Sequence, residues 1–339
     1  MSEALPRAAG QAVARGLLKA QPEDFLVYEE LGFEPGGEGE HVFLHLEKRL
    51  LNTSDLAQRI SSISGIHPRD IGFSGMKDRQ AVTRQWFSVR MAGREEPDWR
   101  NLESPGEVQV VAVTRHQRKL KRGVHRANRF RIRLTELQGD RSAIEERLTL
   151  LRQDGAPNYF GPQRFGHGGS TLTQARQWTD RGGRKISRNR RSLYLSALRS
   201  SLFNQVLAQR VAQGTWNRVE AGDMCILHGT RSQFCCETVD TQIEARAASG
   251  DLHPGIPLWG RGGTDLPSLA QVREWLAPEQ TICDFLERAG LELAWRPARL
   301  LPDDFCWQFC DDDSLQLDFR LGAGSYATAL LAELLHESP

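Results

Sequence analysis

The chain has 339 residues, of which 39% are hydrophobic and 26% charged, and its formal net charge is +1. This length exceeds what one ordinary hydrophobic core holds, so we expect two domains, and the composition is typical of a soluble globular protein. No apolar run reaches the roughly eighteen residues of a membrane span, and residues 1–11 lack the apolar segment of a secretory signal. We therefore expect neither a membrane-spanning nor a secreted protein.

The first strands are indicated by alternating residues. Phe25, Val27 and the residues around them suit a short strand after the turn that Pro22 begins, and Phe25 has the pattern of a core residue. Residues 41–46 alternate as a second strand. Two further strands are expected at 85–90 and 107–113.

A helix is predicted between the second and third of these strands. Thr53 or Ser54 is its expected N-cap, and Gly65 is a natural end. Its apolar side chains recur on one face and comprise Leu56, Ile60 and Ile63.

After this helix comes Gly72-Phe73-Ser74-Gly75-Met76-Lys77-Asp78-Arg79. The glycines permit a tight backbone path, but local rules do not require a carboxylate between two cations here. An exposed ion pair in a solvated turn is the common explanation of such a triplet. Elsewhere no P-loop, HExxH, GxSxG or Ser/His/Asp arrangement occurs, and the histidines are scattered. Catalysis would therefore depend on carboxylates, with Asp78 the best candidate and Asp24 and Asp70 weaker ones.

The net charge of +1 conceals two basic segments. Segment 115–133 holds nine Lys and Arg residues and no acid, and segment 181–199 holds seven and no acid. Acids are concentrated in 23–47 and 303–313. This segregation is consistent with a surface that binds a polyanion.

Residues 128–134, inside the first basic segment, alternate as a strand. Asn128 and Phe130 share one face with Ile132 and Leu134, and all three arginines of this stretch lie on the other face. The arginine face must lie in water or dock on phosphate. A helix marked by Ile144, Leu148 and Leu151 ends this region, whose element order indicates an antiparallel α+β domain and not a doubly wound one.

The second half is clearest near its two ends. Residues 154–166 combine glycines and prolines with three aromatics, which indicates a packed loop at a domain junction. A helix is expected at 192–212. Near the C-terminus, 315–321 alternate as a strand, and Ser325 is the expected cap of a helix over 326–336.

The six cysteines indicate neither a metal site nor disulfides. None belongs to a Cys-x-x-Cys pair, and no histidine pair follows at zinc-finger spacing. We expect free thiols in a reducing cytoplasm, and no bound metal.

Five segments together resemble one known family. Residues 75–85 look like the catalytic motif of the tRNA pseudouridine synthase D (TruD) family. Residues 19–29, 157–166, 196–205 and 321–328 also resemble family segments, in the expected order. The resemblance therefore covers essentially the whole chain.

This resemblance implies an α+β fold with a mostly antiparallel catalytic sheet and accompanying helices. A large inserted α/β domain would interrupt the catalytic domain, with a cleft between the two. We expect residues 1–153 and 298–339 to form the catalytic domain, the second part completing its sheet, and residues 154–297 to form the insertion. Both basic segments would face tRNA phosphates.

The family isomerises uridine 13 in the D-arm of tRNA to pseudouridine without a cofactor, and the resemblance implies the same activity here. Asp78 falls on the catalytic aspartate, the nucleophile or base that starts cleavage of the glycosidic bond. Phe25, Asn128 and Phe319 fall on positions that contact the substrate. Phe130 falls on an aromatic thought to stack on the flipped base.

Lys77 is a further expected substrate contact. Lys77 and Arg79 would also favour the ionised form of Asp78 if their side chains point toward it. This requires the segment to be a loop, because adjacent residues in a strand point apart.

Two other functions remain as alternatives. One is a tRNA-binding or tRNA-chaperone protein whose modification activity is secondary or lost. The other is a metal-dependent nuclease, which the acids at 303–304 and 311–313 disfavour because they have the pattern of solvated loop residues. For the leading function we expect a cytoplasmic monomer with tRNA as partner.

Overall fold

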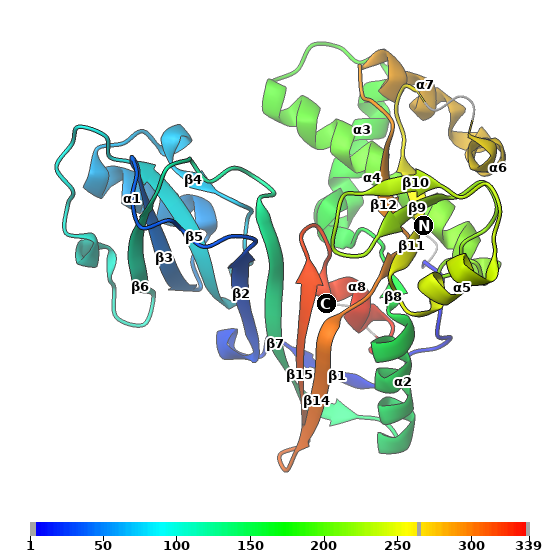
Figure 1. Ribbon diagram of the computed structural model, residues 1–339, viewed down its shortest axis with the longest axis horizontal. Helices are drawn as coiled ribbons and strands as arrows, with labels where there is room; N and C mark the ends of the chain where they lie inside the picture. The colour runs from blue at the N-terminus through cyan, green and yellow to red at the C-terminus, as the bar shows by residue number, and fades with distance from the viewer. Residues whose placement is uncertain (1–4, 263–265, 337–339) are drawn as a thin grey trace. The chain divides into compact units, whose positions relative to one another are not determined.

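A computed structural model gives the structure of residues 5–262 and 266–336. Within them the chain divides into two units, each with its own strands (Figure 1). We call residues 14–140 and 302–325 the sheet unit, and residues 5–13, 141–301 and 326–336 the helical unit. The predicted insertion boundaries, 153/154 and 297/298, concern the family's domain architecture and stay a prediction.

The sheet unit contains nine strands in the described residues. Seven follow one another across the sheet in the order β14-β15-β7-β2-β5-β3-β6 (Figure 1), while β1 pairs with β7 and β4 with β5. Their bounds are β1 Arg15–Leu18, β2 Phe25–Leu31, β3 His41–Arg49, β4 Gly72–Phe73, β5 Val82–Arg90, β6 Val108–His116, β7 His125–Gln138, β14 Asp303–Cys310 and β15 Ser314–Gly322. Among these nine strands of the described residues, only β2 and β5 pair in parallel. The predicted antiparallel α+β class is confirmed.

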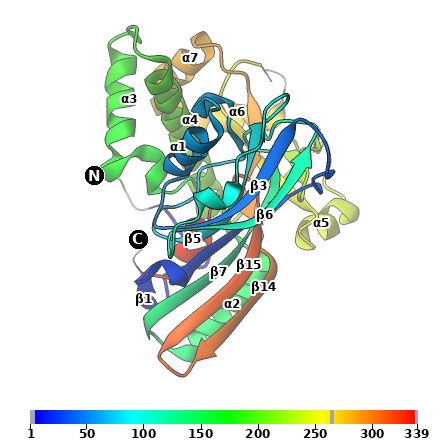
Figure 2. The same cartoon turned by 90° about the vertical axis from the view of Figure 1, so that its left-hand side faces the viewer.

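Helix α1 (Thr53–Ser64) covers one face of the sheet at β3 and β5 (Figure 2). Its buried Leu56 and Ile60 pack with Leu44 of β3 and Phe87 of β5. The predicted cap is wrong by one position, because Asn52 is the N-cap. The hydroxyl of Thr53 has other partners, described below. Gly65 ends the helix in the left-handed conformation, as expected.

The helical unit is organised around α4 (Arg188–Ala212), which begins earlier than predicted because Ser187 caps it. Buried side chains along α4, among them Leu198, Phe203 and Val206, form the centre of this unit's core. The other helices are α2 Arg141–Asp154, α3 Ser170–Asp180, α5 Thr241–Ala248, α6 Pro267–Trp275, α7 Gln280–Arg288 and α8 Ala327–Ala332. In the described residues no helix has the length and apolar character that crossing a membrane requires.

Two small antiparallel sheets complete the helical unit. One has the strand order β10-β9-β11-β12, and the other pairs β13 with β8. The bounds are β8 Ala156–Pro157, β9 Met224–Leu227, β10 Gln233–Cys235, β11 Leu252–Leu258, β12 Ala294–Pro297 and β13 Arg299–Leu300.

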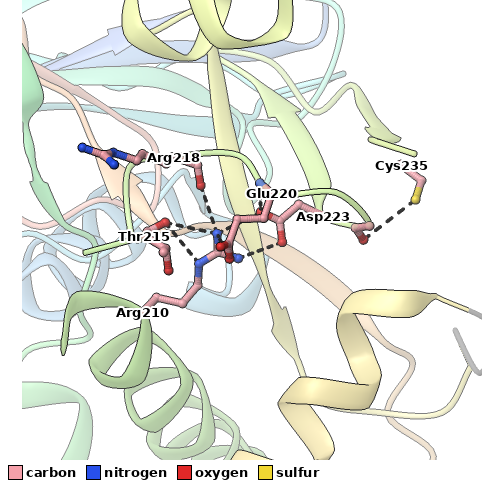
Figure 3. A network of polar contacts seen from close by, with 7 residues as sticks. Arg210, Thr215, Arg218, Glu220, Asp223 and Cys235 are labelled. Carbon is pink, nitrogen blue, oxygen red and sulfur yellow. Dashed lines mark hydrogen bonds and ion pairs between the residues drawn. The ribbon is translucent and has the colours of Figure 1, made fainter. Parts of the chain in front are cut away.

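A buried ion pair ties the end of α4 to the turn before β9 (Figure 3). Arg210 donates to both carboxylate oxygens of Asp223, at 2.7 and 2.8 Å. Its other N–H groups reach the carbonyls of Thr215 and Arg218. A carboxylate and two carbonyls therefore satisfy this buried arginine, which is what a structural role requires.

The predicted C-terminal helix is too long and its cap is wrong. Helix α8 has Tyr326 as its N-cap and ends at Ala332. The next residues bond with the N-terminal segment, since the carboxylate of Glu333 accepts from the amides of Ala8 and Ala9. The carbonyl of Leu334 also accepts from Val13. These contacts draw the chain out of the helix although its apolar pattern continues.

Candidate active site

Asp78 lies in an irregular segment, residues 74–81, between β4 and β5; we call it the Asp78 loop. Its side chain is 36% exposed, and Oδ2 accepts a hydrogen bond from Nζ of Lys19 at 3.0 Å. The Lys19 ammonium also lies 4.2 Å from the centre of the Phe25 ring. The carboxylate is therefore open to solvent on one side and held by a cation on the other.

A second lysine holds the backbone of the same residue. Nζ of Lys48, a buried side chain at the end of β3, donates to the carbonyl of Asp78 at 2.9 Å. Burial lowers the pKa of Lys48 to about 8, although the charge of Asp78 opposes this shift. Two lysines from different segments thus fix the carboxylate and the carbonyl of one residue.

A relay of side chains fixes the backbone before Asp78. The hydroxyl of Thr53, at the start of α1, accepts from the amide of Lys77 at 3.0 Å and donates to Oε1 of Gln85 at 2.9 Å. Gln85 in turn donates to the carbonyl of Gly75 at 2.9 Å. Because both side chains are buried in regular elements, the loop is positioned before any ligand binds.

Glycine is required where the chain enters this loop. A Cβ at Gly72 would lie 2.3 Å from the carbonyl oxygen of Leu120 and 2.4 Å from Oγ of Ser88. The carbonyl of Ser74 then accepts from the amide of Gly123 at 2.7 Å. A side chain at position 72 would displace these neighbours and with them the loop.

Neither cation beside Asp78 points toward it. The ammonium of Lys77 pairs with Oε2 of Glu29 at 2.6 Å, and the Lys77 side chain is 6% exposed. Oε1 of Glu29 accepts from the amide of Trp86 at 3.1 Å, so its carboxylate binds groups on both sides. Arg79 donates to the carbonyl of Leu50. The condition for Lys77 and Arg79 to favour ionised Asp78 is therefore not met, and Lys19 is the cation that pairs with its carboxylate.

The three predicted aromatic residues lie side by side on β2, β7 and β15. Phe319 is directly opposite Phe130 in the sheet, and their rings are stacked with centres 5.3 Å apart. The Phe25 ring meets Phe130 edge-on at 6.1 Å. All three are buried, Phe130 being 7% exposed. They form an aromatic row, which Lys19 connects to Asp78.

Asn128 lies on the same face of β7 as Phe130. Its Nδ2 is 3.3 Å from Nε2 of His125, and burial lowers the pKa of that histidine, which favours the neutral ring. Its Oδ1 is buried and has no hydrogen-bond partner in the described part of the chain. A buried acceptor without a partner is rare in folded proteins, so a donor from a ligand suits this position.

The arginine face of β7 is largely neutralised within the sheet. Arg131 pairs with Asp318 at 2.9 Å, and Arg133 bonds to Asp312 and Ser314 of the neighbouring hairpin. A pocket of about 490 Å³ lies beside these arginines, lined by Ala20, Gln21, Glu23, Asp24, Arg131, Arg133, Thr135, Glu136 and Gln316. Asp24, a weaker catalytic candidate, lines it, but neither Asp78 nor any predicted substrate contact does, so this pocket is not the candidate site.

Other cations of the basic segments remain exposed. Those that form no ion pair within the described residues include Arg118, Lys121, Arg122, Arg126 and Arg129 in the first segment, and Arg181, Arg184, Lys185, Arg188, Arg190 and Arg191 in the second. Exposed unpaired cations of this kind are available to a polyanion in solution.

The other acidic candidates have local roles. Asp24 is buried and accepts from the amide of Gln21 at 2.8 Å, while Asp70 is exposed beside Arg69. Asp303 and Asp304 lie 3.5 and 3.7 Å from Arg320. Across the described ranges, no group of three or more His, Cys, Asp or Glu residues is placed to hold a metal ion.

The sequence interpretation did not identify three residues that the structure puts at the site: Lys19, Glu29 and Lys48. Lys19 and Glu29 are the first and last residues of segment 19–29, which resembles a family motif, so a signal for them existed. No such signal exists for Lys48, because a lysine near the end of a strand is an ordinary polar residue in the sequence pattern.

Comparisons with known proteins agree on one family. A family model described as tRNA pseudouridine synthase D (TruD) matches residues 7–173 and 169–334. A protein named tRNA pseudouridine synthase D from Methylococcus capsulatus is 48% identical over 337 residues, covering 99% of this chain and 95% of that protein. One of the same name from Nitrosococcus oceani is 44% identical over 330 residues, covering 95% and 91%.

A solved structure has the same fold. The crystal structure of a putative tRNA pseudouridine synthase D from Methanosarcina mazei matches with a TM-score of 0.71. The match covers 98% of this chain and 96% of that chain, at 20% sequence identity.

Proposed function

Because the chain belongs to the tRNA pseudouridine synthase D family, we propose that it isomerises uridine 13 in the D-arm of tRNA to pseudouridine, with Asp78 as the catalytic residue. One observation carries this assignment. The Asp78 carboxylate is accessible and paired with Lys19, while buried side chains hold its loop in place. A reactive group fixed in this way loses little entropy when the substrate arrives.

The reaction suits a carboxylate. The bond between N1 of uracil and C1′ of ribose breaks, and a bond between C5 and C1′ forms, while C5 loses a proton and N1 gains one. Atoms and electrons balance within the substrate, so the chemistry itself needs no redox partner. An ionised carboxylate starts it by attacking the nucleoside or by taking a proton, and Lys19 stabilises its charge.

The aromatic row and Asn128 would capture the base. Removing a base from its stack costs about a few kcal/mol, and contact with an aromatic ring returns about 1–3 kcal/mol per base. Phe130 is proposed as the stacking ring, supported by Phe25 and Phe319. Since Phe130 is buried, the row must open for the base to reach it. Oδ1 of Asn128, which lacks a partner among the described residues, would accept from N3–H of uracil.

Further proposals concern Lys77, the basic segments, the state of the enzyme and the insertion. A contact between Lys77 and the substrate stays a prediction, and its bond to Glu29 supports a role in holding the loop. The exposed cations of both basic segments would contact tRNA phosphates. The enzyme would act as a cytoplasmic monomer without a cofactor, and residues 154–297 would be the family's insertion.

The function is tested with purified protein and two tRNA transcripts, one with uridine 13 and one with cytidine at that position. We expect pseudouridine at position 13 of the first transcript and no modification of the second, measured by mass spectrometry of nuclease fragments. Pseudouridine at another position would contradict the assigned site. Tight tRNA binding without any pseudouridine would favour the chaperone alternative.

A further inference from the structure

Two arginines of the helical unit lie against one aromatic ring. The guanidinium carbon of Arg296 is 4.2 Å from the centre of the Phe160 ring, and that of Arg164 is 5.1 Å from the same centre. The two positive charges are therefore within about 9 Å of each other. Like charges this close repel each other, so an anion placed beside them is attracted by both.

Arg164 has only neutral partners in the described part of the chain. It donates to the hydroxyl of Ser196 at 3.1 Å and to that of Tyr326 at 2.5 Å. No carboxylate lies within ion-pair distance of it among these residues, and its side chain is partly exposed. Because a guanidinium has five N–H donors, several remain available to a ligand.

Other buried or half-buried arginines of this unit are satisfied internally. Each of Arg147, Arg199 and Arg299 donates to the carbonyls of three residues, and Arg210 pairs with Asp223. This is how the fold treats an arginine with a structural task. Arg164 differs, because its hydrogen bonds in the described residues go to two hydroxyl groups only, which leaves more of its N–H donors available to a ligand.

The surroundings of both arginines are fixed in advance. Asn204 of α4 accepts from the amide of Phe160 and donates to its carbonyl, both at 2.9 Å. Oδ1 of Asn158 accepts from Arg296 at 2.6 Å, and the Asn158 amide is bonded to Ala298. A ligand would therefore meet a prepared arrangement and lose little affinity to ordering it.

The pKa of Arg296 reflects the same local charge. It is lowered to about 10, mainly by burial, and the positive charge of Arg164 lowers it further. A nearby anion would oppose both effects.

We propose that Arg164, oriented by Ser196 and Tyr326 and backed by the charge of Arg296, binds one phosphodiester group of the RNA substrate. A guanidinium matches phosphate oxygens in a two-pronged arrangement that lysine cannot reproduce. The proposal rests on the proposed function, which makes RNA the substrate. Neither arginine belongs to the two basic segments, so this is a separate contact.

The test measures tRNA affinity as a function of salt for the wild-type protein, Arg164→Gln and Arg164→Lys. For Arg164→Gln we expect a dissociation constant about tenfold higher near 0.15 M salt, and a log–log salt slope smaller by about 0.7–0.9, because one phosphate contact is lost. Arg164→Lys should keep the slope and bind about threefold more weakly, because the charge stays but the paired geometry is lost. The control is Arg273→Gln, an exposed arginine on α6, which should bind as wild type.

Thermal unfolding checks that each variant is folded. If Arg164→Gln does not fold, the tRNA affinity of Arg164→Lys alone tests the proposal. Wild-type affinity and slope in every folded variant would overturn the proposal. The proposal would also be overturned if inorganic phosphate alone stabilised the wild type, but not Arg164→Gln, against thermal unfolding while both proteins bound tRNA equally well. Pseudouridine formation is measured in the same wild-type preparation. Absence of pseudouridine would overturn the proposed function. The phosphate contact of Arg164 would then be judged from the tRNA affinities and salt slopes alone.

Discussion

Two irregular segments of the chain, one carrying Asp78 and the other Arg164, are anchored in the same way although their charged groups have opposite sign. In the Asp78 loop, buried Gln85 of a strand bonds to the backbone of the loop. In segment 158–166, buried Asn204 of a helix does the same for Phe160. Each region therefore uses an amide side chain from a regular element to hold backbone that no helix or sheet supports.

The difference between the regions lies in the counter-charge. Asp78 has Lys19 at 3.0 Å, whereas Arg164 has only hydroxyl and aromatic partners among the described residues. A carboxylate that must stay ionised for chemistry benefits from a permanent cation. A guanidinium that must bind an anion is more effective when no carboxylate competes. This difference is the one expected if Asp78 is the reacting group of the proposed function and Arg164 a binding group.

The largest expected effect is on the stability of the Asp78 loop. Glu29→Gln leaves the buried Lys77 ammonium without its carboxylate, and breaking a buried pair typically costs about 3–5 kcal/mol. Urea unfolding measures the loss. The matched control is Glu23→Gln, which breaks the exposed pair with Arg49 and should cost much less stability, because solvent screens it. Equal losses in the two variants would show that the buried pair does not hold the loop.

The next effect concerns the counter-charge itself. Lys19→Met removes the cation from Asp78 and should lower kcat/KM for pseudouridine formation about 100-fold. Lys19→Arg, which keeps the charge, should restore part of the activity. Steady-state rates on a tRNA transcript check both. Wild-type kinetics in Lys19→Met would mean that Asp78 works without this cation.

A substitution that removes the anchor of segment 158–166 should lower the stability of the protein. Asn204→Ala removes two hydrogen bonds to the buried backbone of Phe160 and should lower the free energy of unfolding by about 1–3 kcal/mol. It should also weaken tRNA binding through Arg164 while leaving the Asp78 loop unaffected. A stable variant with normal tRNA affinity would show that this anchoring is not needed.

The last effect is a dependence of stability on pH that comes from Lys48. Its pKa is about 8 in the folded chain and 10.5 in the reference state, so the unfolded chain binds more protons between these values. The free energy of unfolding should therefore rise with pH from about 8 to about 10.5, relative to Lys48→Met, which cannot titrate. Denaturant unfolding at pH 7.5 and 10 measures this difference. A wild type that loses stability relative to the variant over this interval would contradict the burial of a charged Lys48.

Local patterns predicted much of the fold. The strands expected at 41–46, 85–90, 128–134 and 315–321 all lie within observed strands, because alternation depends only on which side chains face the core. Helix α1 was predicted because its apolar side chains recur on one helical face. The end of α8 was not predicted, because the N-terminal residues that bond to the Glu333 carboxylate and the Leu334 carbonyl come from the other end of the chain.

The candidate site was predictable only in part. The motif around Asp78 identified that residue, and the family model and the relatives confirm the family to which the motif belongs. The sequence did not identify Lys48, Glu29 or the relay through Thr53 as its supports. Such contacts join residues distant in sequence and depend on strand register and side-chain direction, which composition and periodicity do not specify.

If the Asp78 carboxylate starts the reaction, Asp78→Asn should abolish turnover without abolishing binding. Single-turnover formation of pseudouridine should fall at least ~10³-fold, while tRNA affinity stays within about twofold, because only the reacting charge is lost. Asp70→Asn, which changes an exposed aspartate nearby in the sequence, should have wild-type rates. An Asp78→Asn protein that still forms pseudouridine at an appreciable fraction of the wild-type rate would contradict the account.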